Sequence, residues 1–207
     1  MPNIPYIICV GGIMGSGKTT LGQQIWNRVH NRKQPVRHVD IDDVSRDISY
    51  WLSQDTQSYP DDITIWRTFT EFVSRCTSFR EPIILSGTLR DYWKRDQLMQ
   101  MAHTEGYMFQ GIFYNLEPET VIPRAIKRAK DSHGQHLLQA DEATQKILDW
   151  KQKFDEQEHP DLTLPHWTVI TDANLTVSEI LQRLSLKEPY NSLLHERSYP
   201  SAGERMQ

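Results

Sequence analysis

Residues 12–19 of the chain read Gly12-Ile13-Met14-Gly15-Ser16-Gly17-Lys18-Thr19 and match the pattern G-x-x-x-x-G-K-T in full. In such a loop, successive backbone N–H groups form an anion-binding nest at the N-terminus of a helix. The Lys18 side chain then reaches the β- and γ-phosphates of a nucleotide, and the Thr19 hydroxyl ligates Mg²⁺. The stretch therefore predicts binding of ATP and Mg²⁺. The predicted nucleotide contacts are Gly12, Gly15, Ser16, Gly17, Lys18, Thr19 and Thr20.

The segments on either side of this loop have the patterns that a phosphate-binding loop requires. Residues 6–10 are continuously apolar, which is typical of a strand buried on both faces. Beyond the loop, apolar residues recur at helical spacing from Leu21 to Val29, and the pattern ends before Pro35. The sequence thus predicts a strand, a glycine-rich loop and a helix in that order. This context distinguishes a phosphate site from an ordinary glycine-rich turn.

The alternation of strand and helix continues along the chain. Further strands are predicted at residues 36–39, 82–85, 108–114 and 167–170, and helices at residues 63–76, 93–102 and 119–130. Strands that alternate with helices at this spacing indicate an α/β fold with a doubly wound, mainly parallel sheet of five strands. Ligands of such sheets bind at the carboxyl ends of the strands, where the phosphate loop also lies.

The size and composition of the chain fit one globular domain. The 207 residues are enough to bury a sizeable core, and we expect the domain to span residues 1–187, followed by a C-terminal tail at residues 188–207. No apolar window approaches the length of a membrane span, and the N-terminus lacks the features of a secretory signal, which favours a cytoplasmic protein. Cys9 and Cys76 lie in apolar runs without metal-ligand spacing and are predicted to be buried thiols. The sequence does not indicate an oligomeric state.

Missing motifs disfavour two classes of nucleotide-binding protein. A guanine-nucleotide switch needs an N-K-x-D segment, which the sequence lacks. A motor-type ATPase needs an acidic residue at the end of a hydrophobic strand, but the strand at residues 82–85 continues into Ser86-Gly87-Thr88. This departure also leaves open which residue takes the acidic position beside the metal ion. A kinase can hold Mg²⁺ through the loop threonine, the phosphates and water.

Three motifs together give the sequence a resemblance to the small P-loop kinases. These kinases share G-x-x-G-x-G-K-[ST], a D-x-D or D-D motif after the second strand, and a lid that starts with R-x-x-x-R after the fourth. The counterparts here are the phosphate loop, Asp40-Ile41-Asp42 or Asp42-Asp43, and Arg124-Ala125-Ile126-Lys127-Arg128. Over roughly residues 6–184 the chain resembles gluconate kinase, adenylylsulfate kinase, zeta toxins and the kinase domain of polynucleotide kinase. The resemblance implies a P-loop NTPase fold with a helical lid at about residues 124–159, and transfer of the γ-phosphoryl group of ATP to a hydroxyl.

The resemblance also assigns roles to the acidic cluster at residues 40–43. Asp42 is the second acid of D-x-D and the first of D-D, so it is the predicted base that accepts the proton of the acceptor hydroxyl. In the relatives an arginine commonly follows the base by three residues, whereas Arg46 lies four residues after Asp42 and three after Asp43. This offset keeps Asp43 as an alternative base and makes Asp43 and Arg46 candidate acceptor contacts. Asp40 and Thr19 are the predicted metal ligands. The structural alternative is that the cluster caps a helix, where Asp is a favoured residue.

Arginines are the predicted partners of the phosphates and the acceptor. Arg124 and Arg128 lie one helical turn apart, so both guanidinium groups can face the phosphates and offset charge on the transferring group. A solvated basic helix face is the alternative. Residues 133–159 are polar with a weak helical pattern and are interpreted as a mobile cover over the site. Arg90, just after the third strand, is predicted to bind an anionic acceptor, with a surface pair to Asp91 as the alternative.

The sequence does not reveal the acceptor itself. Tyr50 and Trp51 lie where the small P-loop kinases bind their acceptor and are predicted to stack on a ring. We expect a small hydroxyl-bearing acceptor: a sugar, a nucleoside or a natural-product intermediate. A 5′-hydroxyl polynucleotide kinase or a nucleotide kinase is the enzymatic alternative, which the net charge of −4 disfavours because it gives no general attraction to nucleic acid. An ATP-binding regulatory protein without catalytic activity is the other alternative.

Overall fold

The computed structural model describes residues 5–30, 35–56, 61–131 and 140–185 of the chain. The chain divides into two compact units, Met1–Ala173 and Asn174–Gln207. The first unit contains every candidate site residue named above. The predicted tail at residues 188–207 lies outside the described residues, and the domain boundary at residue 187 stays a prediction.

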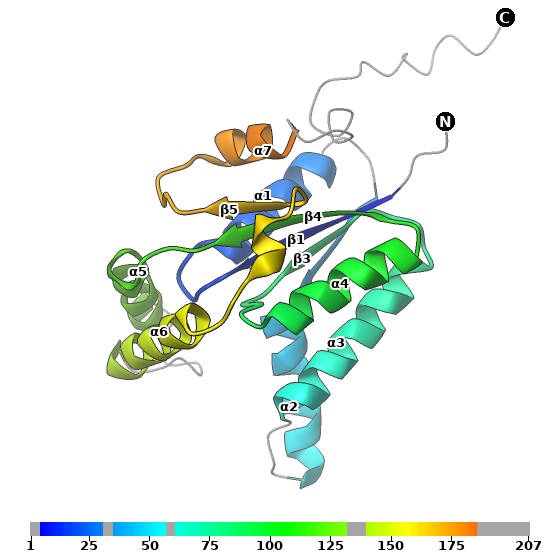
Figure 1. The fold of residues 1–207 in the computed structure, drawn as a ribbon. Helices are drawn as coiled ribbons and strands as arrows, with labels where there is room; N and C mark the ends of the chain where they lie inside the picture. Colours follow the sequence, from blue (N-terminus) through cyan, green and yellow to red (C-terminus); the bar gives the residue numbers. More distant parts are fainter. Residues whose placement is uncertain (1–4, 31–34, 57–60, 132–139, 186–207) are drawn as a thin grey trace, which may run out of the picture. The chain divides into compact units, whose positions relative to one another are not determined.

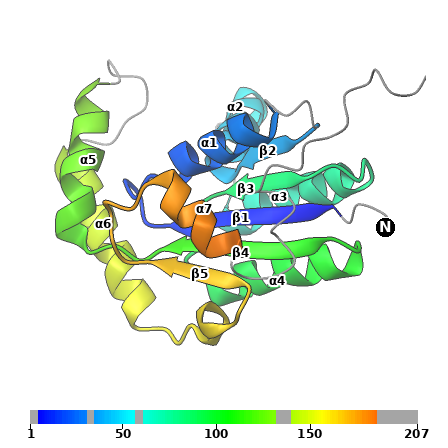
Figure 2. The same ribbon diagram turned by 90° about the horizontal axis from the view of Figure 1, so that it is seen from above.

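A parallel sheet of five strands forms the centre of the first unit (Figure 1). The strands are β1 (Tyr6–Gly12), β2 (Arg37–Asp40), β3 (Ile83–Ser86), β4 (Met108–Tyr114) and β5 (Trp167–Ile170). Figure 2 shows them side by side in the order β2-β3-β1-β4-β5. All seven residues of β1 are buried, as expected for a central strand covered on both faces. The predicted α/β fold with a doubly wound sheet of five strands is confirmed.

Helices cover both faces of this sheet. The helices of the first unit are α1 (Lys18–His30), α2 (Ile41–Thr56), α3 (Asp62–Thr77), α4 (Tyr92–Thr104), α5 (Pro118–Asp131) and α6 (Ala140–Asp155), with the short 3₁₀ helix η1 (Pro160–Thr163). Helix α1 lies on one face, and α3 and α4 lie on the other (Figure 1). An apolar cluster lies on the α3 and α4 side, where Ile7 and Cys9 of β1 meet Phe69, Val73 and Leu98. No helix in the described ranges is long and apolar enough to cross a membrane.

Both cysteines are buried free thiols, as predicted. Burial raises the pKa of Cys9 to about 12, and the positive charge of Arg95 opposes this only in part. The thiol therefore stays protonated at neutral pH. Because the thiolate is the reactive form, Cys9 is a packing residue and not a nucleophile.

Helices α5 and α6 lie beside the carboxyl ends of the strands, next to the phosphate loop (Figures 1 and 2). Helix α6 is anchored in the core of the unit, because Ala143, Ile147 and Phe154 are buried. The Phe154 ring stacks on Phe113 of β4 with 5.2 Å between the ring centroids. The weak helical pattern in residues 133–159 thus corresponds to a packed helix over residues 140–155. That this segment is a mobile cover stays a prediction, and residues 132–139 lie outside the described part of the chain.

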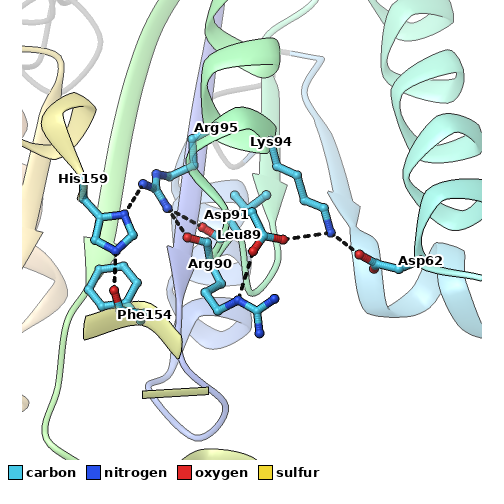
Figure 3. A network of polar contacts seen from close by, with 8 residues as sticks. All are labelled: Asp62, Leu89, Arg90, Asp91, Lys94, Arg95, Phe154 and His159. Carbon is cyan, nitrogen blue, oxygen red and sulfur yellow. Dashed lines mark hydrogen bonds and ion pairs between the residues drawn. The ribbon is translucent and has the colours of Figure 1, made fainter. Parts of the chain in front are cut away.

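A buried ion pair joins α4 to η1. Arg95 Nε donates to Asp161 Oδ2 at 2.6 Å, and Arg95 Nη2 donates to Asp161 Oδ1 at 2.9 Å. Arg95 Nη2 also donates to His159 Nδ1 at 2.9 Å, so His159 Nε2 carries the proton that it donates to the carbonyl oxygen of Phe154 at 2.8 Å. Figure 3 shows this contact with the end of α6. One guanidinium group therefore connects α4, η1 and α6.

Replacement of Asp161 by asparagine tests this network. We expect Asp161→Asn to lower the free energy of unfolding by about 3–5 kcal/mol, because it leaves the buried guanidinium of Arg95 without a carboxylate. The two side chains are 0% and 2% exposed, so water cannot compensate for the loss. Urea unfolding curves measure the effect. As a control, Asp155→Asn removes an ion pair with Lys151 in which Asp155 is 55% exposed, and should change stability by less than about 1 kcal/mol. Similar losses in both variants would contradict the prediction.

The second unit contains α7 (Val177–Ser185). Thr176 N–H donates to Glu179 Oε2 at 2.7 Å, and Glu179 N–H donates to Thr176 Oγ1 at 3.3 Å. These reciprocal bonds form a capping box that defines the start of the helix.

Candidate phosphate and acceptor site

The phosphate loop joins β1 to α1 and has the backbone that an anion nest requires. Gly15 and Gly17 have φ angles of +80° and +94°, in the region that favours glycine. A Cβ atom on Gly15 would lie 2.8 Å from the carbonyl oxygen of Val121 of α5, so this position also needs glycine for close approach. Ser16 is 3% exposed, and its Oγ has no hydrogen-bond partner among the described residues. Buried hydroxyl groups are normally bonded, and a phosphate oxygen would satisfy this one.

Lys18 begins α1 and lies buried among charged groups. Burial lowers the pKa of its ammonium group, whereas the negative charges of Asp42 and Asp40 raise it and Arg128 lowers it further. No ion pair of Lys18 is found within the described residues. The Lys18 ammonium is thus buried, close to two carboxylates and an arginine, and free of an ion pair within the described residues. Such a group is suited to bind the phosphates of a nucleotide.

Asp40 ends β2 and lies at the phosphate loop. Thr19 Oγ1 donates to Asp40 Oδ2 at 3.0 Å, and Ser86 Oγ donates to the same oxygen at 2.6 Å. The backbone N–H of Asp42 donates to Asp40 Oδ1 at 2.8 Å, so Asp40 also caps the start of α2. Asp40 and Ser86 are neighbours in the sheet register. The carboxylate that β3 lacks at Ser86 is therefore present on the adjacent strand.

Thr19 and Asp40 together fit a Mg²⁺ ion that binds along with a nucleotide. Among the described residues, no group of three or more His, Cys, Asp or Glu side chains could hold a metal ion. Mg²⁺ usually keeps several waters and is bound by one or two carboxylates together with substrate phosphates. The donor set fits this mode and does not fit a metal ion held by the protein alone.

The predicted metal role of Asp40 has a direct test. We expect Asp40→Asn to weaken ATP binding in the presence of Mg²⁺ by about tenfold or more, and to leave ATP binding in EDTA nearly unchanged. The asparagine Oδ1 still accepts the Asp42 N–H, so the cap of α2 is retained. Calorimetric titrations with and without Mg²⁺ measure the two affinities. Equal losses under both conditions would show that Asp40 acts only through the structure of the loop.

Asp42 lines a cavity of about 150 Å³, which Thr88 connects to the phosphate loop. Thr88 also lines this cavity, and its carbonyl oxygen accepts the backbone N–H of Gly12 at 3.2 Å. The Asp42 side chain is open to solvent, yet desolvation by the surrounding protein raises the pKa of its carboxyl group, and Lys18 opposes this shift. A raised pKa suits a carboxylate that takes up a proton during a reaction. A larger, shallow depression of about 430 Å³ lies on α3 and α4, and none of the predicted site residues lines it.

The other residues predicted for the acceptor divide into two groups. Arg90 lines the cavity and also forms the alternative contact with Asp91, at 3.0 Å. Asp43 and Arg46 form an exposed ion pair at 3.1 Å, and neither lines the cavity. Tyr50 is 60% exposed and does not line it either, and the side chain of Trp51 lies outside the described part of the structure. Of the predicted residues, Asp42 and Arg90 therefore both line the cavity. Asp43, Arg46 and Tyr50 do not.

The two lid arginines lie on α5 and both are exposed. Arg128 acts electrostatically on Lys18 and on Asp42, which places it near the phosphate loop. Arg124 acts on Tyr114 at the end of β4, where burial raises the pKa of the phenol to about 12 and the arginine opposes the shift. The predicted role at the phosphates therefore has more support for Arg128 than for Arg124.

Sequence reasoning missed most of the lining, including the charged Asp62 of α3 and Lys94 of α4 and the aromatic Trp150 of α6. Lys94 follows Asp91 by three residues at the start of a helix, a spacing that permits an ion pair and could have drawn attention to it. For Asp62 and Trp150 no local signal exists, because only the packing of α3 and α6 brings them to the cavity.

Comparison with known proteins agrees with the fold and the loop. A family model described as AAA domain matches residues 7–156. No curated protein sequence matches the chain. Similar solved structures include a gluconokinase from Sinorhizobium meliloti 1021, with 18% identity over 93% of this chain and 99% of that chain and a TM-score of 0.58.

Two further structures show the same likeness. The tunicamycin resistance protein of Deinococcus radiodurans has 14% identity over 88% of this chain and 94% of its own, with a TM-score of 0.55. A shikimate kinase from Bacteroides thetaiotaomicron has 15% identity over 87% of this chain and 97% of its own, with a TM-score of 0.51. At such identities the likeness concerns the fold, and it confirms the predicted resemblance to the small P-loop kinases at that level. Because the family model covers more than half of the chain, this protein belongs to the AAA domain family, and its fold is that of the small P-loop kinases.

Proposed function

We propose that the protein is an ATP-dependent phosphotransferase that moves the γ-phosphoryl group to a hydroxyl of a small-molecule acceptor. The observation that carries this proposal is the position of Asp42, which lines the cavity and acts electrostatically on Lys18. A carboxylate between a phosphate site and a cavity can take the proton of a hydroxyl as its oxygen attacks phosphorus.

The proposed reaction is a single displacement at phosphorus. The acceptor oxygen forms a bond to the γ-phosphorus, and the bond from that phosphorus to the bridging oxygen of ADP breaks. The hydroxyl proton passes to Asp42. The products are a phosphate ester and ADP.

Each remaining charged group has a role in this scheme. Lys18 and Arg128, with Arg124, offset the charge that spreads over the transferring group. Thr19 and Asp40 would hold Mg²⁺, which would neutralise charge on the phosphates. Among the acids, Asp42 is the base and Asp43 is the alternative. The polypeptide thus supplies positioning and charge, the two contributions that phosphoryl transfer mainly requires.

The alternative is an ATP-binding regulatory protein without catalytic activity. In such a protein we would expect the carboxylates of residues 40–43 to face away from the phosphate loop. Asp40 instead accepts a hydrogen bond from the Thr19 hydroxyl, and Asp42 acts electrostatically on Lys18. Only Asp43, paired with Arg46, has an arrangement that suits a surface role. A cytoplasmic location is part of the proposal, in keeping with ATP as donor and with two free buried thiols.

A screen of acceptor pools with γ-labelled ATP and Mg²⁺ tests the proposal. We expect label to appear in a pool of small hydroxyl compounds. Calorimetry establishes ATP binding in the same preparation. ATP binding without transfer to any pool would contradict the phosphotransferase function and favour a regulatory protein.

A further inference from the structure

The cavity beside Asp42 has charged walls in which the cations are already paired. Its lining includes the carboxylates Asp42, Asp62 and Asp91 and the cations Arg90 and Lys94. Arg90 Nε lies 3.0 Å from Asp91 Oδ1, and Lys94 Nζ lies 2.6 Å from Asp62 Oδ2 and 3.4 Å from Asp91 Oδ2. Figure 3 shows this series of contacts from Arg90 to Asp62. Asp42 takes no part in it, so carboxylates exceed cations in the lining.

Lys94 is held in place from several sides. Its side chain is 10% exposed, and Nζ lies 5.5 Å from the ring centroid of Trp66 and 5.4 Å from that of Trp93. These distances are within the range of cation–π attraction. Asp91 is itself only 17% exposed. Removing one partner of a largely buried ion pair is costly, because it leaves the other charge buried and unpaired. An anionic ligand therefore cannot easily replace Asp91 as the partner of Lys94.

The backbone of the loop that carries Arg90 is held in place by hydrogen bonds from Arg95. Arg95 Nη1 donates to the carbonyl oxygens of Leu89 at 2.8 Å and of Arg90 at 2.6 Å (Figure 3). Leu89 has a φ angle of +44°, which is uncommon for a residue with a side chain and persists only where the surroundings enforce it. The contact of Arg90 with Asp91 therefore belongs to a loop whose backbone is held in one conformation.

From this charge pattern we propose that the acceptor is an uncharged or cationic hydroxyl compound, and that the paired state of Arg90 and Lys94 excludes acceptors with a carboxylate or phosphate near the reacting hydroxyl. The inference rests on the proposed phosphotransferase function. A hydroxyl group can donate to Asp62 or Asp91 and leave the ion pairs intact. An anion must either displace a paired carboxylate or face the excess negative charge. The same reasoning disfavours polynucleotides and nucleotides as acceptors.

Three acceptor pools matched in carbon skeleton test the inference with γ-labelled ATP. The first holds neutral sugars, polyols and nucleosides, the second the corresponding amino sugars and amino alcohols, and the third the corresponding aldonates, hydroxy acids and phosphate esters. We expect transfer in the first or second pool, with kcat/KM about 100-fold or more above that of the matched anion. Transfer mainly in the third pool overturns the inference. No transfer in any pool, with ATP binding intact, instead contradicts the proposed function.

Two variants test whether the ion pairs set this preference. Asp91→Asn and Asp62→Asn each remove a partner of Lys94, and we expect them to lower KM for the matched anion and to reduce the discrimination by about tenfold. Asp62 is 77% exposed, so its replacement removes the shorter of the two Lys94 ion pairs with little effect on folding. Asp96→Asn on α4, which is not among the lining residues, is the matched control. An unchanged preference in both variants would overturn the role of the ion pairs.

Discussion

Replacing Lys18 with alanine is expected to lower kcat/KM by about a thousandfold or more, the scale for loss of a principal charge that stabilises the transition state of phosphoryl transfer. The ammonium group lies at the phosphate loop, and within the part of the chain that the structure describes it forms no ion pair. Initial rates with labelled ATP and the acceptor from the screen measure the effect.

The fold should survive this substitution. Burial lowers the pKa of Lys18, so below that pKa the folded state carries a charge that is less well solvated than in the unfolded chain. Removing the charge therefore does not destabilise the protein electrostatically. Lys146→Ala is the matched control, because Lys146 is 54% exposed and pairs only with Glu142 on the surface of α6 among the described residues. Turnover in a folded Lys18→Ala protein at the level of this control would refute the phosphate role.

Asp42→Asn should lower kcat by about 10²–10⁴-fold, the usual contribution of a general base, and leave ATP affinity nearly unchanged. Asparagine has the shape of aspartate but cannot accept the hydroxyl proton. Because Asp42 lines the cavity while Asp43 pairs with Arg46 on an exposed face, Asp43→Asn should change the rate far less. Paired kinetics on the two variants, with calorimetry for ATP, measure both effects.

The other outcomes of this experiment have distinct meanings. A larger loss in Asp43→Asn would assign the base to Asp43, as the three-residue offset of Arg46 allows. A large loss of Mg²⁺-dependent ATP binding in Asp42→Asn would assign Asp42 to the metal ion. If neither variant slows transfer to a verified acceptor, the proposed base is wrong and the acidic cluster is a helix cap.

The sequence by itself determined the features that depend on contiguous residues. The phosphate loop is one, because its nest is built from the backbone of neighbouring residues and its glycines must adopt positive φ angles, as Gly15 and Gly17 do. The strands are another, because a strand buried on both faces needs an unbroken apolar run. The position of the acidic cluster after the second strand also follows from local pattern.

Only the tertiary structure decided which side chains meet at the cavity. Asp42 and Asp43 are adjacent on α2 and therefore about 100° apart around the helix axis, so only packing against the phosphate loop selects Asp42. Asp40 reaches Ser86 because β2 and β3 are neighbours in the sheet, and it reaches Thr19 because α1 packs beside β2. The ion pairs of Arg90 and Lys94 likewise depend on where α3 and α4 pack. Contacts of this kind join residues that are far apart in the sequence. Their distance in space cannot be inferred from their sequence positions, because it depends on how the helices and strands pack.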